Sequence, residues 1–558
     1  MSVTACRGTQ LRCRSWRAEA LLRLLENVLE VGERPEELVV YASIGKAVKD
    51  WDAYRQITDA LRRLGEDQTL VLQTGRPVAV LNTHAAAPMV VSAVNNTVGN
   101  WATEERFYSR LAEHKTIWGG LTAAAWQYIG RQGVLGGTYE LLRAALGRHF
   151  QETTAPHRWV LTAGLGGMGS SQPISARMLG LSTLVVEADP TKLSRLHAAG
   201  GLDLVLDDLS EALAAVATAT AKRRAVAVGL LGNAAEIFPA IAASEALPDI
   251  VTDQTAAHDA RYGYLPAGYT LETWTSARER DPGRVERDAR ASMAAQIQAM
   301  LELGDRGSVV FENGNNLRVQ ASQVLGEGER ERVFAEIPGF MEAYLRPLFS
   351  RGIGPFRWMI LSGDEHDLKV VDDLASTMFP ERPEIARWIG LARRHIPLQG
   401  LPARSCWLGY GERSALAVAV NEAVADGRIT APVAFSRDHL DSAGMTHPRI
   451  GTEGMRDDSD GVTDWPLLDA MLLAAGGADL VAVHSGGGGY SGWMQSAGVT
   501  VVADGTQAAA IRLRRALDLD SGLGVIRHAT AGYGEALDAV EKSRQPGAHG
   551  EPLNLIQN

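Results

Sequence analysis

From about residue 130 onward, short apolar runs alternate with longer stretches that carry apolar residues at helical spacing. Helical patterns separate most of the apolar runs, whose lengths are typical of buried strands. Strands that alternate with helices in this way predict a doubly wound parallel sheet. The expected strands are residues 159–163, 182–187, 202–206, 225–230 and 249–252.

The chain before and after this region has a different pattern. Residues 15–31 carry leucines at helical spacing, and further strands are expected at 37–43, 68–73 and 77–82, with a helix at 101–111. The charged helical segment 270–305 closes the sheet domain, and glycine turns become frequent near residue 346. We therefore expect an α/β protein in which a Rossmann-like domain (131–342) is inserted into a larger α/β core formed by residues 1–130 and 343–558.

The first strand of the expected sheet runs directly into a glycine turn. Gly164, Gly166 and Gly169 have the G-x-G-x-x-G spacing, which permits a tight turn, close approach to a pyrophosphate and close packing of helix on strand. Pro173 suits the first turn of the helix that follows. The N-terminus of that helix favours an anion, so the turn predicts a phosphate site.

Other loops of the same domain support a dinucleotide. Glu187 ends the next strand about twenty residues after the turn, where a carboxylate accepts hydrogen bonds from a ribose. The loops 232–236 and 252–258 also follow strands, at the sheet edge where open α/β sheets bind ligands. The alternative is a glycine-rich turn in an ordinary α/β domain with a solvated Glu187. His258 alone is more typical of a hydrogen-bonded loop residue than of a catalyst.

Composition excludes several classes of protein. The chain has 558 residues, a net charge of −11 and a pI near 5.7, which argue against general nucleic-acid binding. Residues 1–25 lack the continuous apolar core of a signal peptide or membrane span, so we expect a cytoplasmic protein without membrane contact. Three cysteines without metal-ligand spacing indicate neither a disulfide framework nor a metal site.

Four polar clusters mark the C-terminal half. They cover residues 351–358, 437–441, 456–461 and 484–492, and each is compatible with a solvated turn. The four consecutive glycines from Gly486 carry an entropic cost, which favours close approach of the backbone to a ligand. Cys406 stands in the glycine-rich segment 400–411, which we expect to be a loop; a small buried hydrophobe is the simplest interpretation of this cysteine.

These segments together resemble the urocanate hydratase (urocanase) family over residues 36–539. The resemblance rests on long sequence motifs that occur in the same order as in the family. They are LTAGLGGMG at 161–169, GNAAEI at 232–237, GYLPAG at 263–268, GPFRW at 354–358, GLPAR at 400–404, RDHLDS at 437–442, and SDG at 459–461 before DWPL at 464–467.

The resemblance implies a cytoplasmic homodimer that acts on urocanate, an intermediate of histidine degradation. It implies a tightly bound NAD⁺ that is not consumed. In the family, C4 of the nicotinamide is an electrophile that bonds to a carbon of the substrate's imidazole ring and makes the conjugated system receptive to water. The adduct then breaks down, which regenerates NAD⁺ and releases imidazolonepropionate. The cofactor therefore supplies the difficult chemistry, while protein groups orient it and move protons.

The resemblance also assigns residues. Tyr41, Thr122 and Arg357 match substrate-binding positions, and a guanidinium suits a carboxylate because it can donate two charge-assisted hydrogen bonds. Cys406 and Asp441 match catalytic positions, as do Tyr41 and Arg357; Asp438 and His439 remain alternatives to Asp441 for proton transfer. The expected cofactor contacts are Ala42, Ser43, Gly167, Met168, Gly169, Glu187, Lys192 (an arginine in the family), Asn233, Ala234, Gln254, Thr255, Ala256, Ala257, His258, Tyr264, Leu265, Asn313 and Gly488.

The departures from the family pattern cluster at the expected ligand. The family has Tyr-Gly-Gly-Ile-Gly at residues 41–45, glutamine at Gly120, tyrosine at Asn313 and histidine at Ser485. Because three of these four changes remove bulk, we assign Gly120 and Ser485 to the substrate pocket. We expect a ring-substituted substrate: thiourocanate or S-methylthiourocanate from ergothioneine degradation, then N-methylurocanate. Plain urocanate is the alternative.

Two other classes of protein use the same glycine turn. A conventional NAD-dependent dehydrogenase would release NADH during turnover, whereas the urocanase reaction releases none. A catalytically silent NAD-binding protein would not need Cys406, Arg357 and Asp441, all of which are present.

Overall fold

The structure is a computed structural model that describes residues 3–41, 43–437, 439–441, 444–449, 451–487 and 490–556. The chain forms two compact units. The first comprises Met1–Gly136, Arg346–Pro448 and Gly454–Asn558, and the second comprises Gly137–Leu345 and Arg449–Glu453. Among the described helices, none combines the length and the apolar character needed to cross a bilayer.

The second unit contains a six-stranded sheet whose strands are all parallel, in the order β11-β10-β6-β7-β9-β8. This confirms the predicted doubly wound fold. The strands are β6 (Trp159–Ala163), β7 (Ser182–Glu187), β8 (Leu204–Leu206), β9 (Ala227–Leu231), β10 (Ile250–Val251) and β11 (Val309–Val310). The first five overlap the predicted strands, and β11 is too short to have been recognised.

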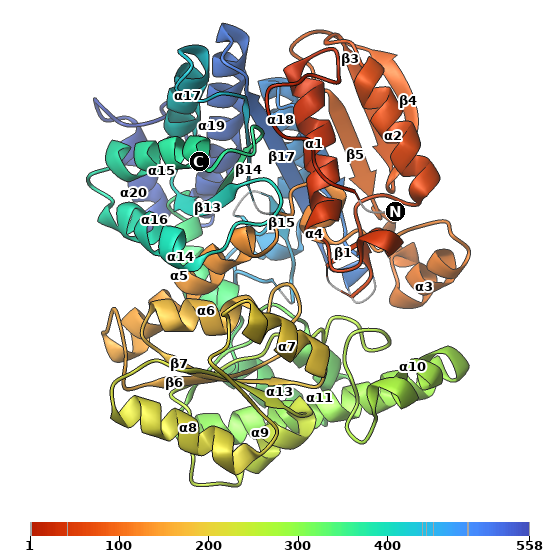
Figure 1. The fold of residues 1–558 in the computed structure, drawn as a ribbon, viewed down its shortest axis with the longest axis vertical. Helices are drawn as coiled ribbons and strands as arrows, with labels where there is room; N and C mark the ends of the chain where they lie inside the picture. Colours follow the sequence, from red (N-terminus) through yellow and green to blue (C-terminus); the bar gives the residue numbers. More distant parts are fainter. Residues whose placement is uncertain are drawn as a thin grey trace. The chain divides into compact units, whose positions relative to one another are not determined.

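Helices cover both faces of this sheet (Figure 1). One face carries α6 (Ser171–Met178) and α7 (Pro190–Ala198), and the other carries α8 (Leu209–Ala221), α9 (Ala234–Ala242) and α11 (Pro282–Asp305). The chain moves from β6 to β7 in one direction and later crosses to β10 on the other side of β6. The reversal beside β6 is the topological switch point, where open α/β sheets bind ligands. The unit also contains α10 (Leu271–Arg280), α12 (Leu317–Ser322) and α13 (Glu327–Glu336).

The first unit contains a nine-stranded mixed sheet to which both ends of the chain contribute. Its order is β13-β12-β14-β17-β16-β5-β3-β4, with β15 beside β17. The N-terminal part supplies β3 (Gln68–Gln73), β4 (Arg76–Asn82) and β5 (Val90–Val94). The C-terminal part supplies β12 (Gly354–Ile360), β13 (Ala403–Leu408), β14 (Val433–Arg437), β15 (Met445–Thr446), β16 (Leu480–His484) and β17 (Gln495–Ala503). The parallel pair β5–β16 joins the two parts.

The remaining elements of this unit surround the sheet. They are α1 (Trp16–Glu30), α2 (Trp51–Arg63), α3 (Glu104–Ala112), α4 (Leu121–Ala124), α14 (Arg346–Phe349), α15 (Glu365–Met378), α16 (Pro383–His395), α17 (Glu412–Ala425), α18 (Asp464–Gly476), α19 (Gln507–Thr530) and α20 (Gly534–Ser543), with the small ladder of β1 (Val39–Tyr41) and β2 (Gly45–Lys46). Helix α5 (Arg131–Phe150) spans the boundary in sequence between the units.

The expectation that Cys406 lies in a loop is wrong. It lies in β13, where every residue from Ala403 to Leu408 is buried. The glycines that suggested a loop flank the strand instead, and Gly400 and Gly411 have positive φ angles of 58° and 75°. Residues 354–358 of the cluster 351–358 are likewise no solvated turn, because β12 is buried throughout; Arg351 lies in an exposed turn before the strand. Glycine turns at strand ends concealed these strands in the sequence.

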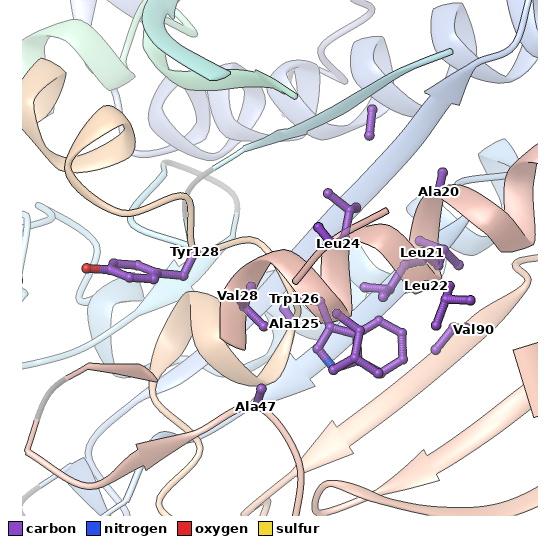
Figure 2. Close-up of a cluster of buried hydrophobic side chains, with 14 of the residues drawn as sticks. Ala20, Leu21, Leu22, Leu24, Val28, Ala47, Val90, Ala125, Trp126 and Tyr128 are labelled. Atoms are coloured by element: carbon purple, nitrogen blue, oxygen red, sulfur yellow. The ribbon is translucent and has the colours of Figure 1, made fainter. Parts of the chain in front are cut away.

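Helix α1 packs its apolar side chains into the core of the first unit (Figure 2). Ser15 caps the helix by accepting a hydrogen bond from the backbone N–H of Ala18, and leucines at helical spacing, such as Leu21 and Leu24, are fully or almost fully buried. Figure 2 shows them beside Val28, and the same cluster contains Trp126. The predicted helix at residues 15–31 is therefore confirmed.

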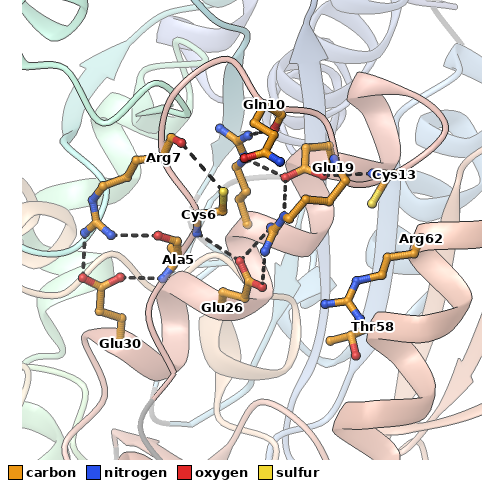
Figure 3. Close-up of polar contacts among 12 residues, drawn as sticks. Ala5, Cys6, Arg7, Gln10, Cys13, Glu19, Glu26, Glu30, Thr58 and Arg62 are labelled. Carbon is orange, nitrogen blue, oxygen red and sulfur yellow. Dashed lines mark hydrogen bonds and ion pairs between the residues drawn. The ribbon is translucent and has the colours of Figure 1, made fainter.

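Carboxylates of α1 hold the N-terminal segment in place (Figure 3). Glu30 accepts a hydrogen bond from the N–H of Ala5 at 2.7 Å, and Glu19 accepts one from the N–H of Cys13 at 3.1 Å. Glu19 also pairs with Arg12 at 3.0 Å and with Arg23 at 2.8 Å, and its carboxylate is fully buried. Burial alone would raise the pKa of Glu19, but hydrogen bonds from Arg23 and Arg12 outweigh burial and lower it.

We predict that Glu19→Gln destabilises the protein by about 3–5 kcal/mol, because it leaves the buried guanidinium of Arg23 without its counter-charge. Since the folded-state pKa of Glu19 is lowered, its contribution is complete above the pKa of an unfolded glutamate, about 4.3, and is lost as the pH falls. Urea unfolding at neutral pH measures the effect. The control Glu37→Gln removes an exposed pair with Arg34 and should cost less than about 1 kcal/mol. Equal losses in the two variants would contradict the prediction.

Candidate functional site

The three glycines after β6 differ in what surrounds them. A Cβ on Gly164, whose φ is +86°, would lie 2.4 Å from the carbonyl oxygen of Gln254, and one on Gly169 would lie 2.0 Å from that of Gly164. A Cβ on Gly166 would meet nothing within 4 Å. Gly164 and Gly169 therefore permit the turn and its packing on β10, whereas Gly166 presents bare backbone to open space. This division matches a dinucleotide-binding turn.

The start of the helix differs in detail from the expectation. The N–H groups of Ser170, Ser171 and Gln172 donate to carbonyls of the turn, including those of Gly166 and Gly169. Helical winding therefore begins within the turn itself, before α6. The backbone N–H groups at the start of α6, which were expected to be unpaired, are therefore already hydrogen-bonded. What the turn offers an anion is the exposed backbone at Gly166 and the helix dipole.

Glu187 is tied to this turn. One carboxylate oxygen accepts a hydrogen bond from the N–H of Leu165 at 2.6 Å, and the other accepts one from Asp189 at 2.9 Å. Lys192 lies 3.9 Å away, and only 7% of the Glu187 surface is exposed. The alternative of a solvated Glu187 is therefore wrong. The carboxylate stands beside the glycine turn at the carboxyl edge of the sheet.

The later loops at this edge are fixed by side-chain amides. Asn233 caps α9 through its oxygen and donates from its nitrogen to the carbonyl of Leu265 at 3.1 Å. Gln254 donates to the backbone oxygen of Asn313 at 2.6 Å. The loop after β9 is thereby joined to the segment that holds Tyr264, and the loop after β10 is joined to the loop after β11.

The sequence did not single out Asp253, which organises the loop after β10. Asp253 is fully buried and accepts hydrogen bonds from Thr255, Gln296 and Asn315. Burial raises its pKa to about 6, although these hydrogen bonds oppose the shift. Gln296 also accepts from the hydroxyl of Tyr264 at 2.8 Å. A lone aspartate in a polar loop gives no sequence signal for such a role.

The predicted cofactor residues of the second unit gather at one edge. Tyr264 and Leu265 lie in the segment held by Asn233 and Gln296, and the others follow the carboxyl ends of parallel strands: Gly167, Met168, Gly169, Glu187, Lys192, Asn233, Ala234, Gln254, Thr255, Ala256, Ala257, His258 and Asn313. Ser43 belongs to the first unit, where its φ is +70°. Ala42 and Gly488 lie outside the described residues.

In the first unit, the predicted substrate residues Gly120 and Thr122 lie next to the phenol of Tyr41, a third such residue. The hydroxyl of Tyr41 lies 3.0 Å from the backbone nitrogen of Thr122 and 3.1 Å from its hydroxyl. The Tyr41 ring stacks on Tyr128 at 4.7 Å, and burial raises the pKa of Tyr41. Gly120 has a φ of +55°, and a Cβ there would lie 3.6 Å from the Tyr41 ring. The same Cβ would lie 3.3 Å from that of Ala123, so a side chain at this position would be crowded.

Arg357 brings a buried positive charge to the same group. It lies on β12 with 3% of its surface exposed, and Nη1 donates to the backbone oxygen of Gln127 at 2.8 Å. Burial lowers its pKa to about 10, while the nearby phenols of Tyr41 and Tyr128 act in the opposite direction. The guanidinium remains charged at neutral pH, in surroundings that suit a carboxylate.

Cys406 and Asp441 lie on the other face of the sheet. Cys406 pairs with Phe356, whereas Arg357 pairs with Ser405 and Ser436, and neighbouring positions along a strand point to opposite faces. Asp441 forms an ion pair with Arg413 at 2.7 Å. A Cβ on Gly354, on the Phe356 face, would lie 2.6 Å from the Asp441 carboxylate.

Ser485 directly follows β16. Its hydroxyl lies 3.3 Å from the side-chain oxygens of both Asn96 and Gln495. The preceding His484 donates to the carbonyl of Leu121 at 2.7 Å, next to Gly120 and Thr122. The end of β16 is therefore linked to the turn that carries the predicted substrate residues Gly120 and Thr122.

This arrangement defines an α/β protein with a Rossmann-like ligand edge in one unit and a buried arginine with two tyrosines in the other. Models of the urocanase N-terminal, Rossmann-like and C-terminal domains match residues 3–127, 130–344 and 347–542. The chain belongs to the urocanase family, and it is a hydro-lyase.

One curated relative is similar along almost its whole length. It is the S-methyl thiourocanate hydratase of Variovorax sp. (strain JCM 16519 / RA8), which is 47% identical over 532 residues, or 95% of each chain. A solved structure, L-tryptophan dehydrogenase from Nostoc punctiforme, is 12% identical over 46% of this chain and 60% of its own, with a TM-score of 0.18. A similarity this weak supports no conclusion.

We predict that Gly169→Ala lowers the thermal midpoint, because the new methyl group would overlap the carbonyl of Gly164 and force the turn apart; a strained substitution of this kind costs about 1–3 kcal/mol. Gly166→Ala is the matched control and should leave the midpoint unchanged, since nothing lies within 4 Å of its Cβ. Differential scanning calorimetry measures both. A larger loss in Gly166→Ala would contradict this division of roles.

Proposed function

We propose that the protein hydrates S-methylthiourocanate, with a bound NAD⁺ that is not consumed. The observation that carries the proposal is the 47% identity, over 95% of both chains, to a hydratase named for that substrate. The loss of the family's glutamine at Gly120, beside the Tyr41 ring, supports a substrate that differs from urocanate. Thiourocanate, N-methylurocanate and urocanate are the competing substrates.

The second unit fits the proposed cofactor. Gly166 gives a pyrophosphate access to bare backbone, and Glu187 stands beside the turn where a ribose is expected. The gathered loops after β9, β10 and β11 would hold the rest of the dinucleotide. When bound, NAD⁺ supplies an electrophilic nicotinamide carbon, a reactivity that amino acid side chains lack.

The residues of the first unit would bind the acrylate end of the substrate. Arg357 is buried and cationic, so we assign it to the carboxylate. Tyr41 and Thr122 are already joined by hydrogen bonds and would complete that end of the site. The roles of Cys406 and Asp441 stay predictions from the resemblance, as do the cytoplasmic location and the homodimer.

Comparative kinetics tests the substrate. Purified enzyme should remove the conjugated acrylate absorption of S-methylthiourocanate with a higher kcat/KM than that of urocanate, thiourocanate or N-methylurocanate. A higher kcat/KM for urocanate would assign the protein to ordinary histidine degradation, and no turnover of any compound would refute the proposed function altogether.

We predict that Arg357→Gln lowers kcat/KM for the preferred substrate roughly 10- to 100-fold, since a hydrogen bond to a charged group is worth about 1.5–3 kcal/mol. The NAD⁺ content, measured after acid release, should stay at the wild-type level. The control Arg62→Gln alters an exposed arginine of α2 and should change neither quantity. Loss of the cofactor with unchanged substrate affinity would show that Arg357 is assigned to the wrong ligand.

A further inference from the structure

His439 and His484 form a buried pair of imidazoles near the proposed substrate residues. Both side chains are fully buried, and their ring centroids are 4.8 Å apart at an angle of 50°. His484 ends β16, while His439 follows β14 two residues after Arg437. The two imidazoles differ sharply in how their nitrogens are used.

The hydrogen bonds of His484 fix its protonation state. Its Nε2 lies 2.7 Å from the carbonyl oxygen of Leu121, which can only accept, so Nε2 carries the hydrogen. Its Nδ1 accepts a hydrogen bond from the N–H of Gly486 at 3.1 Å. Burial lowers the pKa of His484 to about 4, so the ring is neutral at physiological pH. Both nitrogens are committed to the backbone, and His484 has a structural role.

His439 has no such bonds. Neither ring nitrogen has a hydrogen-bond partner among the described residues. Burial, reinforced by the charges of Arg437 and Arg357, lowers the pKa of His439 well below its usual value. A neutral imidazole has one N–H donor and one acceptor, and leaving both unpaired in a protein interior is costly. Such exceptions in native structures need an explanation, of which a bound ligand is one.

A second unpartnered polar atom lies close by. The amide nitrogen of Gln127 donates to Val499 and Thr500, but Oε1 has no hydrogen-bond partner among the described residues. A Cβ on Gly498 would lie 2.5 Å from Nε2 of His439 and 3.4 Å from Oε1 of Gln127, so both atoms stand over this glycine. The backbone oxygen of Gln127 accepts the hydrogen bond from Arg357. The imidazole of His439 and the guanidinium of Arg357 therefore both lie close to Gln127, whose side-chain oxygen has no partner among the described residues.

We infer that His439 is a substrate-contacting residue, which hydrogen-bonds the bound urocanate-type molecule beside the carboxylate held by Arg357, with Oε1 of Gln127 as a further acceptor. The inference rests on the proposed function. A urocanate-type ring offers both an N–H donor and a ring nitrogen acceptor, which complement a neutral imidazole and an amide oxygen. Asp441 is less suited to this contact, because its carboxylate is paired with Arg413 on the other sheet face.

His439→Gln tests the inference in the full-length enzyme with its cofactor. We expect kcat/KM for the preferred substrate to fall at least tenfold, and calorimetry should show at least tenfold weaker binding of the saturated imidazolepropionate analogue. NAD⁺ content and the thermal midpoint should stay close to those of the wild type. The control His366→Gln replaces an exposed histidine of α15 and should change nothing.

A second variant separates contact from structural support. His439→Ala leaves a space the size of an imidazole, so added free imidazole should restore part of the lost activity. Unchanged analogue binding in His439→Gln would overturn the inference, as would loss of cooperative unfolding in both variants, which would make His439 a structural residue. If the wild-type enzyme hydrates none of the candidate substrates, the proposed function itself fails, and that result precedes any result from the variants.

Discussion

The pairing of β5 with β16 is the constraint on which the first unit depends. It joins strands at Val90–Val94 and Leu480–His484 in parallel register, across most of the length of the chain. The pairing makes one sheet from the two chain ends and leaves the Rossmann-like unit as the segment between them. It also ends at His484, whose ring binds Leu121 and thereby anchors the turn that carries Gly120 and Thr122.

Around that sheet the protein separates its buried charges. On one face Arg357 lies near two tyrosines and donates to a carbonyl, an arrangement that retains attraction for an incoming anion. On the other face Arg413 and Arg437 share the carboxylates of Asp441, Asp469 and Asp520. Buried pairs of this kind are weak evidence for stability. In the second group each arginine faces at least one carboxylate, whereas no carboxylate contributes to the pKa shift of Arg357.

The sequence was most informative where local chemistry decides structure. The apolar runs of β6 and β7 and the spacing of Gly164, Gly166 and Gly169 predicted the Rossmann-like unit, and the surroundings of each glycine explain why: two positions exclude a Cβ and one does not. The loop prediction for Cys406 is wrong because glycines at the ends of β13 resemble those of a loop. The sequence does not show that both ring nitrogens of His439 lack partners. Its neighbours Gln127 and Gly498 are distant in sequence and meet it only in the tertiary fold.

The proposed function requires that the dinucleotide-binding unit serve hydration and not net oxidation. The most direct measurement follows S-methylthiourocanate through complete conversion, with mass spectrometry of the product and near-ultraviolet absorbance for free NADH. The account predicts a product heavier than the substrate by the mass of one water, with no NADH released. A product that differs by two hydrogens and appears together with stoichiometric NADH would contradict it.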